Sequence, residues 1–172
     1  MKRNLYAVYT KANQEKRVAA LLSKKKVETF LPLNRIVTTQ GNKSRMEFEP
    51  LIACFVFVCI TEAEMEVIKR LNFVLNFVYW LGSPAIIKDV EIDNIKNFIG
   101  QYSNIRLEKI NVSTNGIVKI ISLAKKYSTE NFVHTQNSLT TLVVPSLGYS
   151  LISEKQVENS GSLEFIVENN LS

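Results

Sequence analysis

Few residues of this 172-residue chain could perform covalent or metal chemistry. Enzymes and metal sites need a nucleophile with a base, paired carboxylates, or histidines and cysteines at ligand spacing. The sequence has one histidine, His134, and no HxxxH motif, CxxC motif or glycine-rich phosphate loop. Cys54 and Cys59 are five residues apart in a predicted strand, on opposite faces, where they can neither form a disulfide nor share a metal. We therefore expect a protein that is not an enzyme and has no cofactor or metal; an enzyme would need a pocket joining His134 to a carboxylate.

Acidic side chains do not suggest a catalytic pair either. Asp89, Glu91 and Asp93 occupy alternate positions of a predicted helix, which spreads them around its axis. They are predicted to be solvated charges that favour the start of the helix.

Basic side chains are concentrated at the front of the chain, whose formal net charge is +5. Residues 1–48 hold eleven Lys and Arg against three Glu, whereas residues 49–172 hold ten against thirteen acidic residues. Lys11, Lys16 and Arg17 cluster where the first helix is predicted to begin. Such a cluster can bind phosphates or anionic headgroups. The alternative is an ordinary solvated helix face.

A membrane or secreted location is not indicated. The chain has no run of 18 apolar residues, and its first ten residues turn quickly into an alternating strand pattern, unlike a signal peptide. We expect a cytoplasmic monomer without a membrane partner.

The first 100 residues alternate between strand and helix patterns. The period changes from two to 3.6 residues and back, which predicts an α+β domain with helices over an antiparallel sheet. The predicted elements are a strand at 5–10, a helix from Asn13, a strand at 27–31, a hairpin around Gly41, a strand at 51–60, a helix at 62–71, a strand at 73–81 and a helix at 89–99.

The remainder of the chain has a different composition. Residues 101–113 are polar and irregular, and we expect a linker there. Short β-type runs separated by Asn, Ser, Gly and Pro fill residues 114–172, which predicts a small all-β barrel that does not refold into helices.

Four segments in this order resemble the NusG-like transcription elongation factors over nearly the whole length. They are YAVYTK at 6–11 with the Glu15-Lys16 helix start, FLPL at 30–33, PL at 50–51 leading into FVFV at 55–58, and FVY at 77–79 followed by PAII at 84–87. The chain is most similar to specialised, RfaH/UpxY-like paralogues that act as operon-specific antiterminators. The resemblance implies an N-terminal NusG-type domain at 1–100 and an SH3-like barrel with a KOW motif at 114–172.

The family suppresses pausing or termination by binding elongating RNA polymerase, and the resemblance assigns residues to three contacts. An apolar pocket that docks on the clamp helices of the β′ subunit would be lined by Tyr9, Phe55, Phe57 and Phe77. Glu66 and Lys69 would touch the gate loop of the β subunit, which holds the clamp shut across the cleft. Lys11, Lys16 and Arg17 would contact the non-template DNA strand in the transcription bubble.

Two departures limit the resemblance. Ile52-Ala53-Cys54-Phe55 replaces the family's aromatic, proline, small residue and tyrosine. Residues 124–130 replace the glycine-rich KOW turn, so the KOW motif is degenerate and recruitment of a ribosomal protein or of the termination factor Rho is in doubt. A free-standing RNA- or single-stranded nucleic-acid-binding module is the alternative, because an aromatic-bearing sheet with a basic flank also describes a base-stacking platform.

Overall fold

The structure is a computed structural model that describes residues 2–113, 117–120, 125–128, 133–136 and 139–156. These residues form two compact units. The first holds residues up to Leu33 together with Pro50–Asp89, and the second holds Asn34–Glu49 together with residues from Val90 onward.

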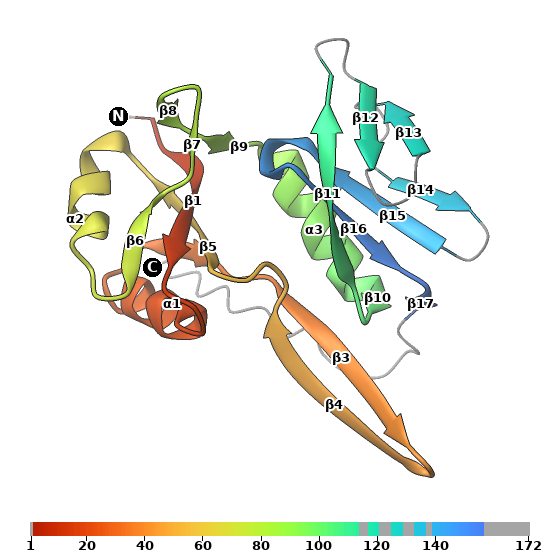
Figure 1. Cartoon of the computed structure of the whole chain (residues 1–172). Helices are drawn as coiled ribbons and strands as arrows, with labels where there is room; N and C mark the ends of the chain where they lie inside the picture. Colours follow the sequence, from red (N-terminus) through yellow and green to blue (C-terminus); the bar gives the residue numbers. More distant parts are fainter. Residues whose placement is uncertain (1, 114–116, 121–124, 129–132, 137–138, 157–172) are drawn as a thin grey trace. The chain divides into compact units, whose positions relative to one another are not determined.

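The first unit is built on an antiparallel sheet in the order β2-β5-β1-β6, with β9 also paired to β1 (Figure 1). Its strands are β1 (Asn4–Thr10), β2 (Glu28–Phe30), β5 (Phe55–Ile60), β6 (Val74–Phe77) and β9 (Ile86–Ile87). The helices α1 (Glu15–Lys24), η1 (Glu62–Glu64) and α2 (Met65–Lys69) and the small hairpin β7 (Tyr79–Trp80) and β8 (Ser83–Pro84) complete it.

Apolar periodicity explains why these elements pack together. On α1, Val18, Ala19 and Leu22 are completely buried, as their spacing on one helical face predicts. Central strands β1 and β5 are paired from Asn4 opposite Ile60 to Tyr9 opposite Phe55. Because both are covered on two sides along most of their length, their sequences are nearly continuous apolar runs.

One buried carboxylate joins α1 to the start of β5. Glu15, in the first turn of α1, is only 4% exposed, and its Oε1 accepts a hydrogen bond of 2.7 Å from the backbone N–H of Cys54. Cys54 has a positive φ of 64°, and its carbonyl accepts from the N–H of Thr10 at 2.9 Å. The turn before β5 is therefore fixed to both α1 and the end of β1.

The second unit combines a hairpin, a helix and a second sheet. The hairpin consists of β3 (Leu33–Gln40) and β4 (Lys43–Pro50), and the helix is α3 (Asp89–Gln101). The six-stranded sheet has the order β13-β12-β11-β16-β15-β14, and all of its pairings are antiparallel. Its strands are β11 (Arg106–Val112), β12 (Ile117–Ile120), β13 (Lys125–Ser128), β14 (Val133–Gln136), β15 (Leu139–Val144) and β16 (Tyr149–Ser153), with η2 (Pro145–Leu147) between the last two. The short strands β10 (Tyr102–Ser103) and β17 (Lys155–Gln156) pair with each other.

Two asparagines fix the base of the hairpin to the segment between β10 and β11. Asn34 donates to the carbonyl of Ile105 at 2.6 Å and accepts from its N–H at 3.0 Å. Asn104 makes the same pair of bonds with Val37, at 2.7 and 3.2 Å. Such paired amide–backbone bonds satisfy four backbone groups at once and define the direction in which the hairpin leaves its unit.

The order of elements predicted for residues 1–100 is confirmed, including the hairpin, whose loop is Gly41-Asn42 with a positive φ of 58° at Gly41. The β-rich character of the C-terminal part is confirmed as well, as a second antiparallel sheet; closure into a barrel is not seen among the described residues. The part of the predicted barrel at 157–172 lies outside them.

Three expectations need correction. The irregular linker expected at 101–113 contains β10 and the seven-residue strand β11, which pairs with the following strand β12 and with the distant strand β16. The helix α3, expected in the first domain, belongs from Val90 onward to the second unit. Glu91 is 1% exposed and not solvated, because its Oε1 accepts the N–H of Ser146 at 2.9 Å and thereby joins α3 to η2.

Candidate functional site

Two of the four predicted docking aromatics lie together at the surface of the first unit. Tyr9 on β1 and Phe55 on β5 are direct cross-strand neighbours, with ring centroids 4.7 Å apart and planes tilted by 59°. Tyr9 is 39% exposed and Phe55 is half-buried. A partly exposed pair of aromatic rings of this kind can act as an anchor for an apolar partner.

Phe57 and Phe77 are core residues. Phe57 is completely buried and stacks on Phe30 with centroids 6.0 Å apart. Phe77 is 1% exposed, meets the edge of Tyr6 at 6.1 Å, and pairs with Val8, so it lies on the face of the sheet opposite Tyr9. The structure therefore does not bring these two rings to the surface with Tyr9 and Phe55.

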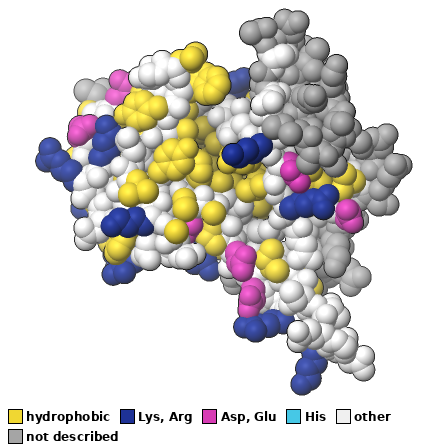
Figure 2. All heavy atoms as spheres, in the orientation of Figure 1, with side chains coloured by type: hydrophobic (Ala, Val, Ile, Leu, Met, Phe, Trp, Pro, Cys, Tyr) yellow, Lys and Arg dark blue, Asp and Glu magenta, His cyan; other side chains and the backbone are white. Residues whose placement is uncertain are grey.

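Another apolar cluster was not predicted from the sequence. The β7–β8 hairpin exposes three consecutive large side chains, Tyr79 at 43%, Trp80 at 72% and Leu81 at 90%. Leu81 and Gly82 both have positive φ, 49° and 82°, as the tight two-residue turn requires. Apolar side chains of this unit also gather on the face drawn in Figure 2, with Lys and Arg among them. In the sequence, the Leu81-Gly82 pair could have indicated this exposed cluster, because a short hairpin does not bury the residues of its own turn.

Glu66 and Lys69, the predicted gate-loop contacts, form an ion pair on α2. Lys69 Nζ donates to Glu66 Oε1 at 2.9 Å and lies 6.0 Å from the centroid of the Tyr79 ring. The hydrogen bond from Lys69 lowers the pKa of Glu66, and the same bond raises the pKa of Lys69. Both groups therefore remain charged near neutral pH and sit next to the β7–β8 hairpin.

The three predicted nucleic-acid contacts are all exposed, and two of them meet one aromatic residue. Lys11, Lys16 and Arg17 lie at the end of β1 and on the first turn of α1. The Arg17 guanidinium carbon lies 4.5 Å from the centroid of the Phe73 ring. The backbone N–H of Lys11 donates to the carbonyl of Phe73 at 2.9 Å. Phe73 was not singled out from the sequence.

The hairpin tip carries further basic charge. Lys43 and Arg45 are exposed, and Arg45 pairs with Glu47 at 2.6 Å. Arg35, on β3 near the base of the hairpin, is only 8% exposed, and its guanidinium carbon lies 5.8 Å from the centroid of the Phe48 ring.

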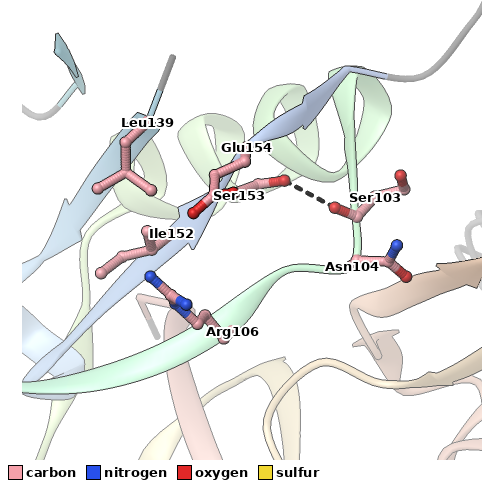
Figure 3. Close-up of a pocket in the computed structure, with 7 residues that line it drawn as sticks. All are labelled: Ser103, Asn104, Arg106, Leu139, Ile152, Ser153 and Glu154. Carbon is pink, nitrogen blue, oxygen red and sulfur yellow. Dashed lines mark hydrogen bonds between the residues drawn. The ribbon is translucent and has the colours of Figure 1, made fainter. Parts of the chain in front are cut away.

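Nothing in the described residues forms a catalytic constellation. The second unit has a cavity of about 140 Å³, smaller than a typical ligand pocket, and His134 does not line it (Figure 3). Its lining residues are Ser103, Asn104, Arg106, Leu139, Ile152, Ser153 and Glu154. Within the described part of the chain, no His, Cys, Asp and Glu side chains gather as metal ligands, and no helix is long and apolar enough to cross a membrane.

Both cysteines are free thiols. Cys54 precedes β5 in a left-handed conformation, so the strand-alternation argument does not apply to it. Burial, followed by the neighbouring Glu28, raises the pKa of the Cys59 thiol, which disfavours a reactive thiolate.

Comparisons with known proteins agree with this architecture. Residues 3–96, more than half of the chain, match the family model described as "NusG: Transcription termination factor nusG". The solved structure described as "Domain interaction in Thermotoga maritima NusG" has a TM-score of 0.50 and 16% identity, and the match covers 91% of this chain and 94% of that chain. The structure described as "Crystal Structure of MjSpt4:Spt5 complex conformation A" has a TM-score of 0.32 and 18% identity, with 87% and 98% coverage. The search of curated proteins found no match.

Proposed function

The chain belongs to the NusG family of transcription elongation factors, and from this premise we propose that it binds elongating RNA polymerase and suppresses pausing or termination. Membership in this non-enzymatic family also means that the chain is not an enzyme. The observation that supports the proposed contact best is the pair of exposed Tyr9 and half-buried Phe55, which lies inside the matched residues.

In the proposed complex, these two rings receive an apolar ridge of the clamp helices of the β′ subunit. Helix-in-groove recognition needs only a few aromatic anchors, which carry most of the affinity. The buried rings of Phe57 and Phe77 support the sheet below and contribute through packing. Trp80 and Leu81 expose further apolar surface on the same unit.

Glu66 and Lys69 are proposed to contact the gate loop of the β subunit. A factor that touches both sides of the polymerase cleft stabilises the closed clamp and shifts the enzyme away from the open, paused state. Because Glu66 and Lys69 already pair with each other, contact with the gate loop must either break this ion pair and replace it with new pairs, or bind to the intact pair.

Lys11, Lys16 and Arg17 are proposed to contact the non-template DNA strand. The specialised form of this proposal is an operon-specific antiterminator of the RfaH/UpxY-like kind. For the second sheet, the corresponding proposal is an SH3-like, KOW-type barrel; its recruitment of a ribosomal protein or of Rho is the least supported part, because the glycine-rich KOW turn is absent from the sequence.

Co-purification with core RNA polymerase, with and without nuclease, tests the proposal. We expect the full chain to be retained in both conditions, and Tyr9→Ala and Phe55→Ala to reduce retention. Val133→Ala, at a 54% exposed apolar residue of the second unit, is the matched control and should bind normally. Retention that disappears after nuclease treatment would favour the alternative function, a free-standing nucleic-acid-binding module, which the contact of Arg17 with Phe73 supports.

A further inference from the structure

Arg17 is held against an aromatic ring that comes from a different part of the first unit. Its guanidinium carbon lies 4.5 Å from the centroid of Phe73, which follows α2 and precedes β6. Arg17 is exposed, whereas Phe73 is half-buried. The Phe73 ring thus lies against the guanidinium, while the Arg17 side chain as a whole stays exposed to solvent.

The backbone around Phe73 makes this ring unusual. The N–H of Val74 donates to the carbonyl of Leu71 at 3.2 Å, which closes a turn with Phe73 as its third residue. Phe73 has a φ of 72°, the conformation for which this turn position normally takes glycine or asparagine. A bulky side chain is strained there. The turn alone therefore gives no reason for a phenylalanine at position 73, whereas the contact with Arg17 gives one.

The surroundings of this pair are basic at the surface. Lys11 is exposed, and its backbone N–H holds the carbonyl of Phe73 at 2.9 Å. Lys16 is exposed beside Arg17 on α1. The one nearby carboxylate of α1, Glu15, points into the unit and bonds the N–H of Cys54. An exposed planar cation flanked by lysines fits single-stranded nucleic acid, whose bases stack on guanidinium planes while phosphates meet ammonium groups.

We propose that the solvent-facing side of the Arg17 guanidinium, supported by the Phe73 ring, is a stacking platform for one base of a single-stranded nucleic acid. This deepens the proposed DNA contact and rests on it, but it gives Arg17 a role different from phosphate binding. Lys11 and Lys16 hold the phosphates on either side of the stacked base. Since every base has a stacking face, the platform accepts any base and adds affinity without sequence readout.

The test uses the full chain and a fluorescently labelled single-stranded DNA of about ten nucleotides, with binding measured by anisotropy at several salt concentrations. Arg17→Lys keeps the charge but removes the planar group, and should weaken binding by about 5- to 100-fold with an unchanged salt slope. Lys11→Ala, in contrast, should reduce the salt slope by about 0.7. Arg17→Lys that binds like the parent chain, or that changes only the salt slope, overturns the proposal.

Phe73→Gly provides a second variant that should fold, because glycine adopts a φ of 72° without strain. It should keep its thermal unfolding temperature yet lose affinity to the same extent as Arg17→Lys. DNA in which abasic sites replace the bases should bind the parent chain and Arg17→Lys equally, and a remaining difference would contradict base stacking.

Co-purification with polymerase separates the two proposals. A chain that binds polymerase but not the oligonucleotide contradicts the platform and leaves the proposed function standing. A chain that shows the Arg17 dependence but does not bind polymerase supports the platform and contradicts the proposed docking.

Discussion

Phe55 and Phe57 should respond very differently to replacement by alanine, although they are two residues apart on one face of β5. Phe57 is completely buried and stacked on Phe30, so Phe57→Ala should cost about 3–5 kcal/mol of the free energy of unfolding. Phe55 is half-buried and packs against the tilted Tyr9 ring, so Phe55→Ala should cost about 1–2 kcal/mol, because Phe55 removes a smaller apolar area from water. Among variants that remain folded, Phe55→Ala should weaken binding to core polymerase more than Phe57→Ala does.

Urea denaturation followed by circular dichroism measures the first effect, and co-purification at low temperature, where both variants remain folded, measures the second. Phe57→Leu keeps most of the buried volume and serves as the control for packing. Equal destabilisation by Phe55→Ala and Phe57→Ala would show that Phe55 is a core residue. A folded Phe55→Ala variant that binds polymerase like the parent chain would contradict the role of Phe55 as an anchor.

Three other changes test the structure at single interactions. Glu15→Ala should destabilise the first unit by about 1–3 kcal/mol, because it leaves the partly buried N–H of Cys54 without its acceptor. Glu15→Gln keeps an acceptor oxygen and should lower the thermal unfolding temperature less; equal effects of the two variants would contradict this hydrogen bond. The N–H and hydroxyl of Thr61 donate to Glu64 and lower its pKa below the ordinary value of 4.5. The ionised carboxylate therefore stabilises the fold above that pH, and this contribution disappears as the pH falls below it. Glu64→Gln should flatten the curve of stability against pH in this range, and an unchanged curve would argue against the capping box. Asn104→Ala should speed amide hydrogen exchange in β3 and leave exchange in β1 unchanged. Equal β3 exchange rates in the parent chain and in Asn104→Ala would show that the asparagine bonds do not hold the hairpin.

The sequence by itself determined the order of elements in the first 100 residues and the family. Both depend on local information: the apolar period distinguishes strand from helix, and glycine at position 41 marks the hairpin turn. It also located the basic residues Lys11, Lys16 and Arg17, because net charge along a chain does not depend on folding.

Only the tertiary structure decided which side chains are available. Strand alternation places Phe55 and Phe57 on the same face of β5, but it does not tell which positions along that face are covered, so the two residues are equivalent in the sequence and not in the fold. Glu91 is buried because it bonds a backbone group 55 residues away, a partner that no helical periodicity reveals. For the same reason, the contact that places Arg17 over Phe73 could not be predicted: it joins two segments that only the sheet brings together.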